Sequence, residues 1–132
     1  MRKLSTATSL YIGSGLVATG LIGYVVYQQA IAPSPYDGFA QCLSDKGATF
    51  YGAWWCSHCS AQKKQFGKAM RNIKYVECSD ASKNMTQECK DAGVEGYPTW
   101  IFADGSKLQG EQSFKTLADK TACELPSSET TQ

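Results

Sequence analysis

Two cysteines three positions apart, Cys56 and Cys59, form a CxxC motif around His58, the only histidine of the chain. This spacing suits three kinds of chemistry: metal binding, haem attachment, or exchange between a dithiol and a disulfide. Haem attachment needs a histidine directly after the second cysteine, where this sequence has Ser60. A zinc site needs further ligands, and no second CxxC or CxxH follows. The motif therefore favours thiol–disulfide exchange without a metal or other cofactor, with a purely structural disulfide as an alternative.

The sequence around the motif places it between a strand and a helix. Residues 48–54 (ATFYGAW) are continuously apolar, as in a central strand buried on both faces. A helix is expected to follow at residues 57–71. The unpaired N–H groups at a helix start stabilise a thiolate, so we expect Cys56 to be the nucleophile. Cys59, one turn later, is expected to be shielded and to attack a mixed disulfide formed on Cys56.

His58 is expected to tune the redox pair. An imidazole beside the Cys56 sulfur favours the thiolate, and stabilising the reduced form makes the disulfide a stronger oxidant. A histidine before the second cysteine is the pattern of isomerases and oxidases, whereas thioredoxins have a proline there. The sequence therefore predicts an oxidising site in which Cys56, Cys59 and His58 are catalytic. The alternative is that His58 is an exposed helix residue without a role.

The remaining elements predict an α/β fold. A short helix between Asp37, its expected N-cap, and Gly47 precedes the apolar strand. Further along the chain we expect a strand at 73–77, a helix at 84–92, a strand at 99–102, a fourth strand after the Asp104-Gly105 turn, and a last helix capped by Ser113. This order predicts a central mixed sheet flanked by helices.

A proline forms the second element of the predicted site. Pro98 lies in "GYPT", just before the third expected strand and about 40 residues after the CxxC motif. In the thioredoxin fold a cis-proline loop faces the CxxC motif and pairs with an extended substrate. We therefore expect a cis bond at Pro98, with Trp55 and Tyr97 as an apolar substrate platform beside the sulfur. An ordinary trans proline opening an edge strand is the alternative.

The N-terminus predicts a membrane anchor. Residues 10–27 carry no charge and are just long enough to cross a bilayer core, and continuing through Gln28 and Gln29 to Ile31 adds margin. Arg2 and Lys3 favour the cytoplasmic side for residues 1–9. The predicted transmembrane helix is therefore 10–31. The alternative is a cleaved signal peptide, since residues 30–32 fit the A-x-A pattern, although proline would directly follow the cut.

The anchor sets the expected organisation of the rest of the chain. Residues 32–36 are read as a linker, 37–126 as the folded domain and 127–132 as a disordered tail. The domain is expected on the extracytoplasmic side, in a periplasm or a lumen, where six cysteines suit an oxidising space. The net charge of +1 argues against a nucleic acid partner.

From Phe39 to about Cys123, the chain resembles the thioredoxin-like domains that partner vitamin K epoxide reductase homologues, fused to them or separate. The matching segments are "FAQCL", "FYGAWWCSHC", "QKKQFG", "YVECS", "CKDAG" and "EGYPTW". The resemblance implies an exported thiol oxidase that oxidises cysteines of client proteins. It would pass the electrons to a membrane quinone reductase of the vitamin K epoxide reductase type, expected here as a separate protein. Two residues depart from the pattern: Ser57 replaces a proline, and Phe50 replaces the buried aspartate of thioredoxins.

Four cysteines lie outside the motif. Cys78 and Cys89, at the end of one strand and in the next helix, are expected to form a structural disulfide. Cys42 and Cys123 would then join the first and last helices by exclusion. The alternative is that one of these pairs relays electrons to the reductase.

Three other functions remain open from the sequence. The same site could run backwards as a disulfide reductase or isomerase. The cysteines could instead serve a non-enzymatic module that delivers copper or zinc. Finally, the domain could be a structural anchor whose groove only holds a partner.

Overall fold

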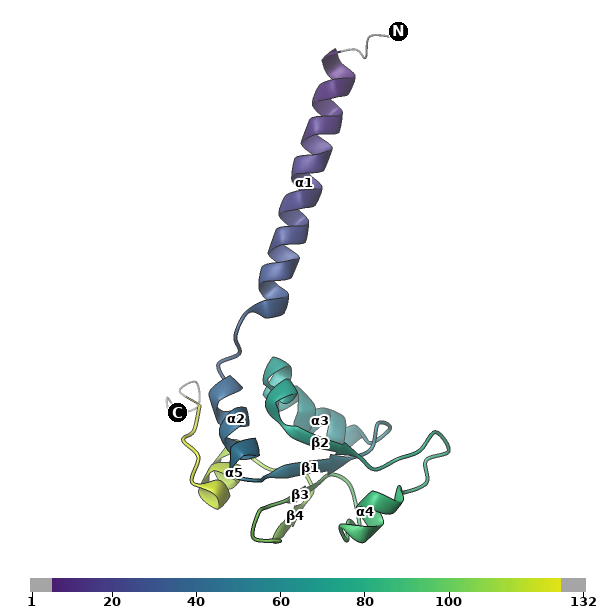
Figure 1. The fold of residues 1–132 in the computed structure, drawn as a ribbon, viewed down its shortest axis with the longest axis vertical. Coiled ribbons are helices and arrows are strands. Elements are labelled where there is room, and N and C mark those ends of the chain that lie inside the picture. The colour runs from purple at the N-terminus through teal and green to yellow at the C-terminus, as the bar shows by residue number, and fades with distance from the viewer. Residues whose placement is uncertain (1–5, 127–132) are drawn as a thin grey trace. The chain divides into compact units, whose positions relative to one another are not determined.

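The computed structural model describes the backbone of residues 6–126 and the side chains of residues 17–29 and 31–126 (Figure 1). The chain divides into two compact units, residues 1–32 and 33–132. The expected tail, 127–132, and the first five residues of the expected cytoplasmic segment lie outside the described residues.

The part of the first unit that the structure describes is the helix α1 (Thr6–Ile31) and the residue after it, and α1 includes the whole segment predicted to span a membrane. The side chains of residues 10–16 lie outside the described residues. Within the part of the chain that the structure describes, no helix has the length and apolar character required to cross a membrane.

The second unit is built on a mixed four-stranded sheet with the strand order β2-β1-β3-β4. β1 runs parallel to β2, while the β1–β3 and β3–β4 pairs are antiparallel. The predicted α/β class is therefore confirmed, and this arrangement fits a thioredoxin-like fold. The strands are β1 (Thr49–Gly52), β2 (Lys74–Glu77), β3 (Thr99–Ile101) and β4 (Lys107–Gln109).

Helices cover both faces of this sheet (Figure 1). Phe50 and Trp100 point into the larger core, which also contains residues of α2, α3 and α5. Tyr51 and Ile101, one position along each strand, pack on the other face in a smaller cluster with α4. The helices are α2 (Asp37–Asp45), α3 (Ser57–Phe66), the 3₁₀ helix η1 (Gly67–Asn72), α4 (Gln87–Asp91) and α5 (Phe114–Thr121).

Aromatic rings form the centre of the larger core. Phe66 on α3 contacts Phe114 on α5 and Trp100 on β3, with ring centroids 4.7 and 6.0 Å apart. Phe50 on β1 lies 4.9 Å from the Trp100 ring. These contacts fix α3, and with it the CxxC motif, against the middle of the sheet.

Two expected element ends beside the CxxC motif were wrong. The apolar strand stops at Gly52, because the chain turns and the Cys56 amide bonds the Ala53 carbonyl at 3.0 Å. The helix expected to reach residue 71 ends at Phe66, and Gly67 follows with φ +54°, a conformation that favours glycine. The apolar patterns used to predict this strand and this helix therefore continue beyond the points where the backbone turns.

Asp37 was also misassigned. It is the first residue of α2 rather than its N-cap, which is Tyr36. Its carboxylate instead accepts hydrogen bonds from the Ser34 amide and from the side chains of Arg71 and Asn72. Asp37 thus ties the start of the domain to the end of η1.

The four cysteines outside the motif form two disulfides. Cys42 of α2 is bonded to Cys123, which follows α5. Cys78, directly after β2, is bonded to Cys89 of α4. One bridge therefore joins the two ends of the domain, and the other closes a loop beside the CxxC motif.

The two disulfides should stabilise the domain to different extents. The Cys42–Cys123 bridge spans 81 positions and the Cys78–Cys89 bridge spans 11. In the chain-entropy model, replacing the first pair by alanine lowers the free energy of unfolding by about 4.5 kcal/mol, and replacing the second by about 3 kcal/mol. Urea denaturation of the two double variants measures this difference. A larger loss for the Cys78–Cys89 variant would contradict it.

Candidate active site

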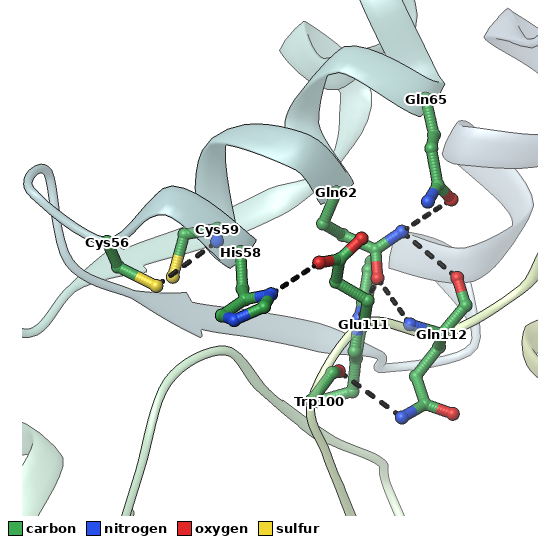
Figure 2. A network of polar contacts seen from close by, with 9 residues as sticks. Cys56, His58, Cys59, Gln62, Gln65, Trp100, Glu111 and Gln112 are labelled. Atoms are coloured by element: carbon green, nitrogen blue, oxygen red, sulfur yellow. Dashed lines mark hydrogen bonds and ion pairs between the residues drawn. The ribbon is translucent and has the colours of Figure 1, made fainter.

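Cys56 lies at the junction between the sheet and α3. It is the N-cap of α3, with an extended backbone (φ −78°, ψ 119°), and its sulfur accepts a hydrogen bond from the Cys59 amide at 3.1 Å (Figure 2). The first amides of a helix carry partial positive charge, so this position favours a thiolate. Both cysteines are free thiols in the structure. The local geometry therefore suits Cys56 as the nucleophile.

Cys59 lies in a different environment one helical turn later. Its side chain is 1% exposed, against 8% for Cys56. Burial, together with the contact to Cys56, raises the pKa of the Cys59 thiol from 9.0 to about 12. Cys59 is thus protonated at neutral pH in the reduced protein, as expected of a resolving cysteine that is not exposed to solvent.

Gly52, the last residue of β1, leaves the space that Cys59 occupies. A Cβ atom at this position would lie 3.1 Å from the Cys59 sulfur and 3.3 Å from Cε2 of Tyr75. Both distances are tighter than ordinary carbon contacts, so any side chain here would displace the thiol or the ring. Glycine at this position therefore permits the close approach of α3 to the sheet.

Glu77 holds the turn that leads into the motif, and sequence reasoning missed it. One carboxylate oxygen accepts the amide of Trp54 at 3.1 Å and that of Ser79 at 3.0 Å, while the other accepts the Tyr75 hydroxyl. Burial and the Glu77 carboxylate raise the pKa of Tyr75. The pairing of Gly52 with Glu77 in the parallel β1–β2 register could have signalled this role, because both strands end at the same sheet edge.

His58 projects from the first turn of α3 and is 71% exposed. Its Nδ1 lies 2.7 Å from a carboxylate oxygen of Glu111, a contact that the sequence did not suggest (Figure 2). A carboxylate at Nδ1 orients an imidazole and fixes which ring nitrogen carries the proton. The ring of His58, within the motif, is thus oriented by Glu111.

Gln62, on the next turn of α3, anchors the segment that carries Glu111 (Figure 2). Its side-chain oxygen accepts the Gln112 amide at 2.7 Å and the Trp100 indole N–H at 3.3 Å. Its side-chain nitrogen donates to the Gln112 carbonyl at 3.1 Å. A fully buried amide needs such partners, and here they join α3, β3 and the segment before α5. Sequence reasoning missed Gln62, since a single polar residue on a helix gives no sign of burial.

Pro98 opens β3 with a cis Tyr97–Pro98 peptide bond. The Tyr97 ring packs edge-on against Trp55, with centroids 5.8 Å apart, and its hydroxyl donates to the Cys78 carbonyl. The structure therefore joins Trp55, Tyr97 and the Cys78–Cys89 loop into one surface. Within the described residues, no group of three or more His, Cys, Asp or Glu side chains is arranged to hold a metal ion.

Taken together, the mixed sheet, the CxxC motif at a helix start and the cis-proline define a thioredoxin-like domain. No family model matches the chain. The chain is 45% identical over 98 residues to the thiol-disulfide oxidoreductase LTO1 of Arabidopsis thaliana, covering 70% of this chain and 26% of that protein. It is 42% identical over 55 residues to a protein disulfide-isomerase of Arthroderma benhamiae, covering 39% of this chain and 10% of that protein.

These similarities support an enzyme of the thiol–disulfide oxidoreductase kind. The chain spans about a quarter of the length of the first relative and a tenth of the second. The similarity therefore concerns a domain of each of these longer proteins.

The two active-site thiols should differ in reactivity. Iodoacetamide should modify Cys56 of the reduced protein faster than Cys59, because Cys56 is the less buried thiol and lies at the start of a helix. Cys59 should react only as the pH approaches about 12, the pKa to which burial raises it. Mass spectrometry of peptides from a pH series measures both rates. Equal modification of the two cysteines at pH 7 would contradict this assignment of roles.

Proposed function

We propose that this protein is a membrane-anchored thiol oxidase that introduces disulfides into client proteins. The observation that carries the proposal is the asymmetry of the CxxC motif. Cys56 caps a helix start that stabilises its thiolate, and Cys59 is a buried thiol with a raised pKa. Stabilising Cys56 in the reduced form makes the oxidised form a better electron acceptor.

The reaction begins with the Cys56–Cys59 disulfide. A client thiolate attacks the Cys56 sulfur, and the bond to Cys59 breaks with its electron pair on Cys59. The Cys59 sulfur takes up a proton, since its thiol pKa is about 12 in the reduced protein. A second client thiolate then attacks the client sulfur of the mixed disulfide. The client disulfide forms, and Cys56 leaves as a thiolate at the start of α3.

His58 and the cis-proline loop support this reaction. An imidazole near the Cys56 sulfur favours the thiolate as the leaving group of the second step. In this proposal an extended client segment lies along the cis-proline loop at Pro98, with Trp55 and Tyr97 as its apolar floor. His58, Pro98, Tyr97 and Trp55 thus keep the roles expected from the sequence as part of the proposal.

Two electrons remain on the protein after each cycle and need an acceptor. We infer that a membrane quinone reductase of the vitamin K epoxide reductase type takes them from Cys56 and Cys59. This inference is supported by the family resemblance of residues 39–123 and by the uncharged segment 10–27. Confining both proteins to one bilayer raises their effective concentration. The catalytic domain would then work on the extracytoplasmic side.

A disulfide isomerase or reductase is the second candidate. It is favoured by the similarity to a protein disulfide-isomerase. It would use the same residues, with the reduced Cys56 thiolate attacking a client disulfide. The direction of electron flow separates the two functions.

The oxidase should transfer its disulfide stoichiometrically to a reduced, unfolded protein. The oxidised full chain, mixed with reduced ribonuclease, should restore ribonuclease activity and end as the dithiol. The Cys56→Ser variant should be inactive. Cys59→Ser should be mixed with scrambled ribonuclease instead: its Cys56 thiolate attacks a client disulfide and releases a client thiol, and the resulting mixed disulfide should accumulate because the resolving thiol is missing. If the reduced chain instead accelerates reshuffling of scrambled ribonuclease while the oxidised chain does not oxidise the reduced client, the isomerase is favoured.

A second arm of this experiment tests the anchor and the partner. The full chain should co-float with liposomes. With a vitamin K epoxide reductase homologue and a quinone in the same bilayer, client oxidation should exceed one disulfide per chain. Recovery of the chain away from the liposomes would contradict the anchor. A yield limited to one disulfide per chain would contradict the partner.

A further inference from the structure

Two exposed tryptophans lie directly before Cys56. Trp54 is 58% exposed and Trp55 is 42% exposed, although both belong to the turn that positions the nucleophile. Large aromatic side chains left open to solvent beside a reactive group are typical of interaction surfaces. We call Trp54, Trp55 and Lys83 the indole–lysine patch.

The two indoles are held in place by the segment after β2. The Trp55 indole N–H donates to the Ser79 hydroxyl at 2.7 Å, and the Trp54 indole N–H donates to the Asp80 carbonyl at 3.3 Å. Tyr97 packs edge-on against Trp55 from the other side. The rings are therefore preorganised, which lowers the entropic cost of binding to them.

Lys83 belongs to the loop closed by the Cys78–Cys89 disulfide. This loop is rigid, because the Asp80 carboxylate accepts the amides of Ser82 and Asn84, each at 2.8 Å, as well as the Asn84 side chain. Lys83 has φ +66°, which is uncommon for a residue with a side chain. Its amide bonds the Asp80 carbonyl at 3.1 Å. The disulfide and the Asp80 turn thus define where the Lys83 side chain begins.

The Lys83 ammonium lies near both indole rings. Its nitrogen is 5.8 Å from the Trp54 centroid and 5.9 Å from the Trp55 centroid, within the range of cation–π attraction. None of the ion pairs found among the described residues involves Lys83. The nearby Asp80 carboxylate is used by the backbone of its own loop. A positive charge is therefore presented on an apolar surface beside the nucleophile.

We propose that the indole–lysine patch selects client segments that carry an aspartate or glutamate close to the reactive cysteine. The occupant is an extended peptide whose cysteine meets Cys56 and whose apolar atoms lie on the indoles, with a carboxylate at Lys83. Charge complementarity argues for an acidic segment and against a basic one. The carboxylate is expected within a few positions of the client cysteine, because Trp54 and Trp55 directly precede Cys56 in the chain and Lys83 lies over their rings. This inference rests on the proposed function, because it specifies the client of the same site.

The size of the effect follows from the exposure of the patch. Solvent-exposed ion pairs contribute little, so the expected preference is about two- to fivefold in kcat/KM and decreases with salt. A buried site would discriminate more strongly. A preference of this size can be measured reliably, because substitution of Lys83 alone should abolish it or reverse it.

The test compares single-cysteine peptides that differ only at the position two residues from the cysteine, where they carry Asp, Asn or Lys. The oxidised full chain is mixed with an excess of each reduced peptide, and the rate at which the peptide disulfide forms and the Cys56–Cys59 pair becomes a dithiol is followed. Each rate is divided by that of the same peptide with a small aliphatic disulfide, which corrects for the intrinsic reactivity of the peptide thiol. Lys83→Gln and Lys83→Glu are compared with Lys115→Gln on α5, a matched loss of charge elsewhere in the domain.

The wild-type chain and Lys115→Gln should favour the Asp peptide over the Lys peptide by about two- to fivefold at low salt. Lys83→Gln should lose this preference and Lys83→Glu should reverse it. Equal rates for all peptides with the wild-type chain, or the same preference in Lys83→Gln, would overturn the inference while leaving the oxidase intact. Failure of the wild-type chain to oxidise any peptide, although it oxidises dithiothreitol, would instead count against the proposed function.

Discussion

The Cys56 sulfur accepts a hydrogen bond from the Cys59 amide. This bond forms because Cys56 has an extended backbone and lies directly before the first turn of α3. Several other residues of the domain hold this junction in place. β1 ends at Gly52, where the missing side chain leaves space for Cys59 against the sheet. Glu77, at the end of the neighbouring strand, fixes the Trp54 amide just before the motif. Phe66 and Gln62 then hold α3 over β3.

This junction gives two identical thiols different chemistry. Cys56 lies among the unpaired amides of a helix start, which favour negative charge. Cys59 is 1% exposed, against 8% for Cys56, and burial raises the pKa of its thiol. In the proposed oxidase, a client thiolate would attack the less buried Cys56 sulfur, and the electron pair would leave on Cys59, which is protonated at neutral pH. The direction of attack follows from the environment of each sulfur rather than from the CxxC spacing.

The sequence predicted those parts of the fold that depend on local pattern. The order of strands and helices followed from apolar runs, and the cap of α5 at Ser113 followed from its residue type. The pairing of Cys78 with Cys89 in the structure is the one suggested by their places on a strand end and a helix. The element order and the Ser113 cap depend on signals within a few residues, and the two paired cysteines lie only 11 positions apart.

Contacts between distant segments could not be predicted in this way. Glu111 lies 53 positions from His58, and Gln62 lies 50 from Gln112, so no local pattern links them. Asp37 has the residue type of an N-cap, but long-range partners on η1 hold its carboxylate. Element ends were misplaced where a backbone turn interrupts an apolar run, as at Gly52. Tertiary hydrogen bonds decided each of these positions, and they have no signature in a single sequence.

The central claim is that the environment of Cys56 makes the Cys56–Cys59 disulfide an oxidant. The most direct test is its reduction potential, measured by equilibrating the full chain with glutathione buffers and quantifying alkylated thiols. The account predicts a value well above that of thioredoxin, between about −200 mV and about −120 mV, the range of disulfide isomerases and oxidases. A potential at or below about −270 mV, the value of thioredoxin, would contradict it and make the protein a reductant.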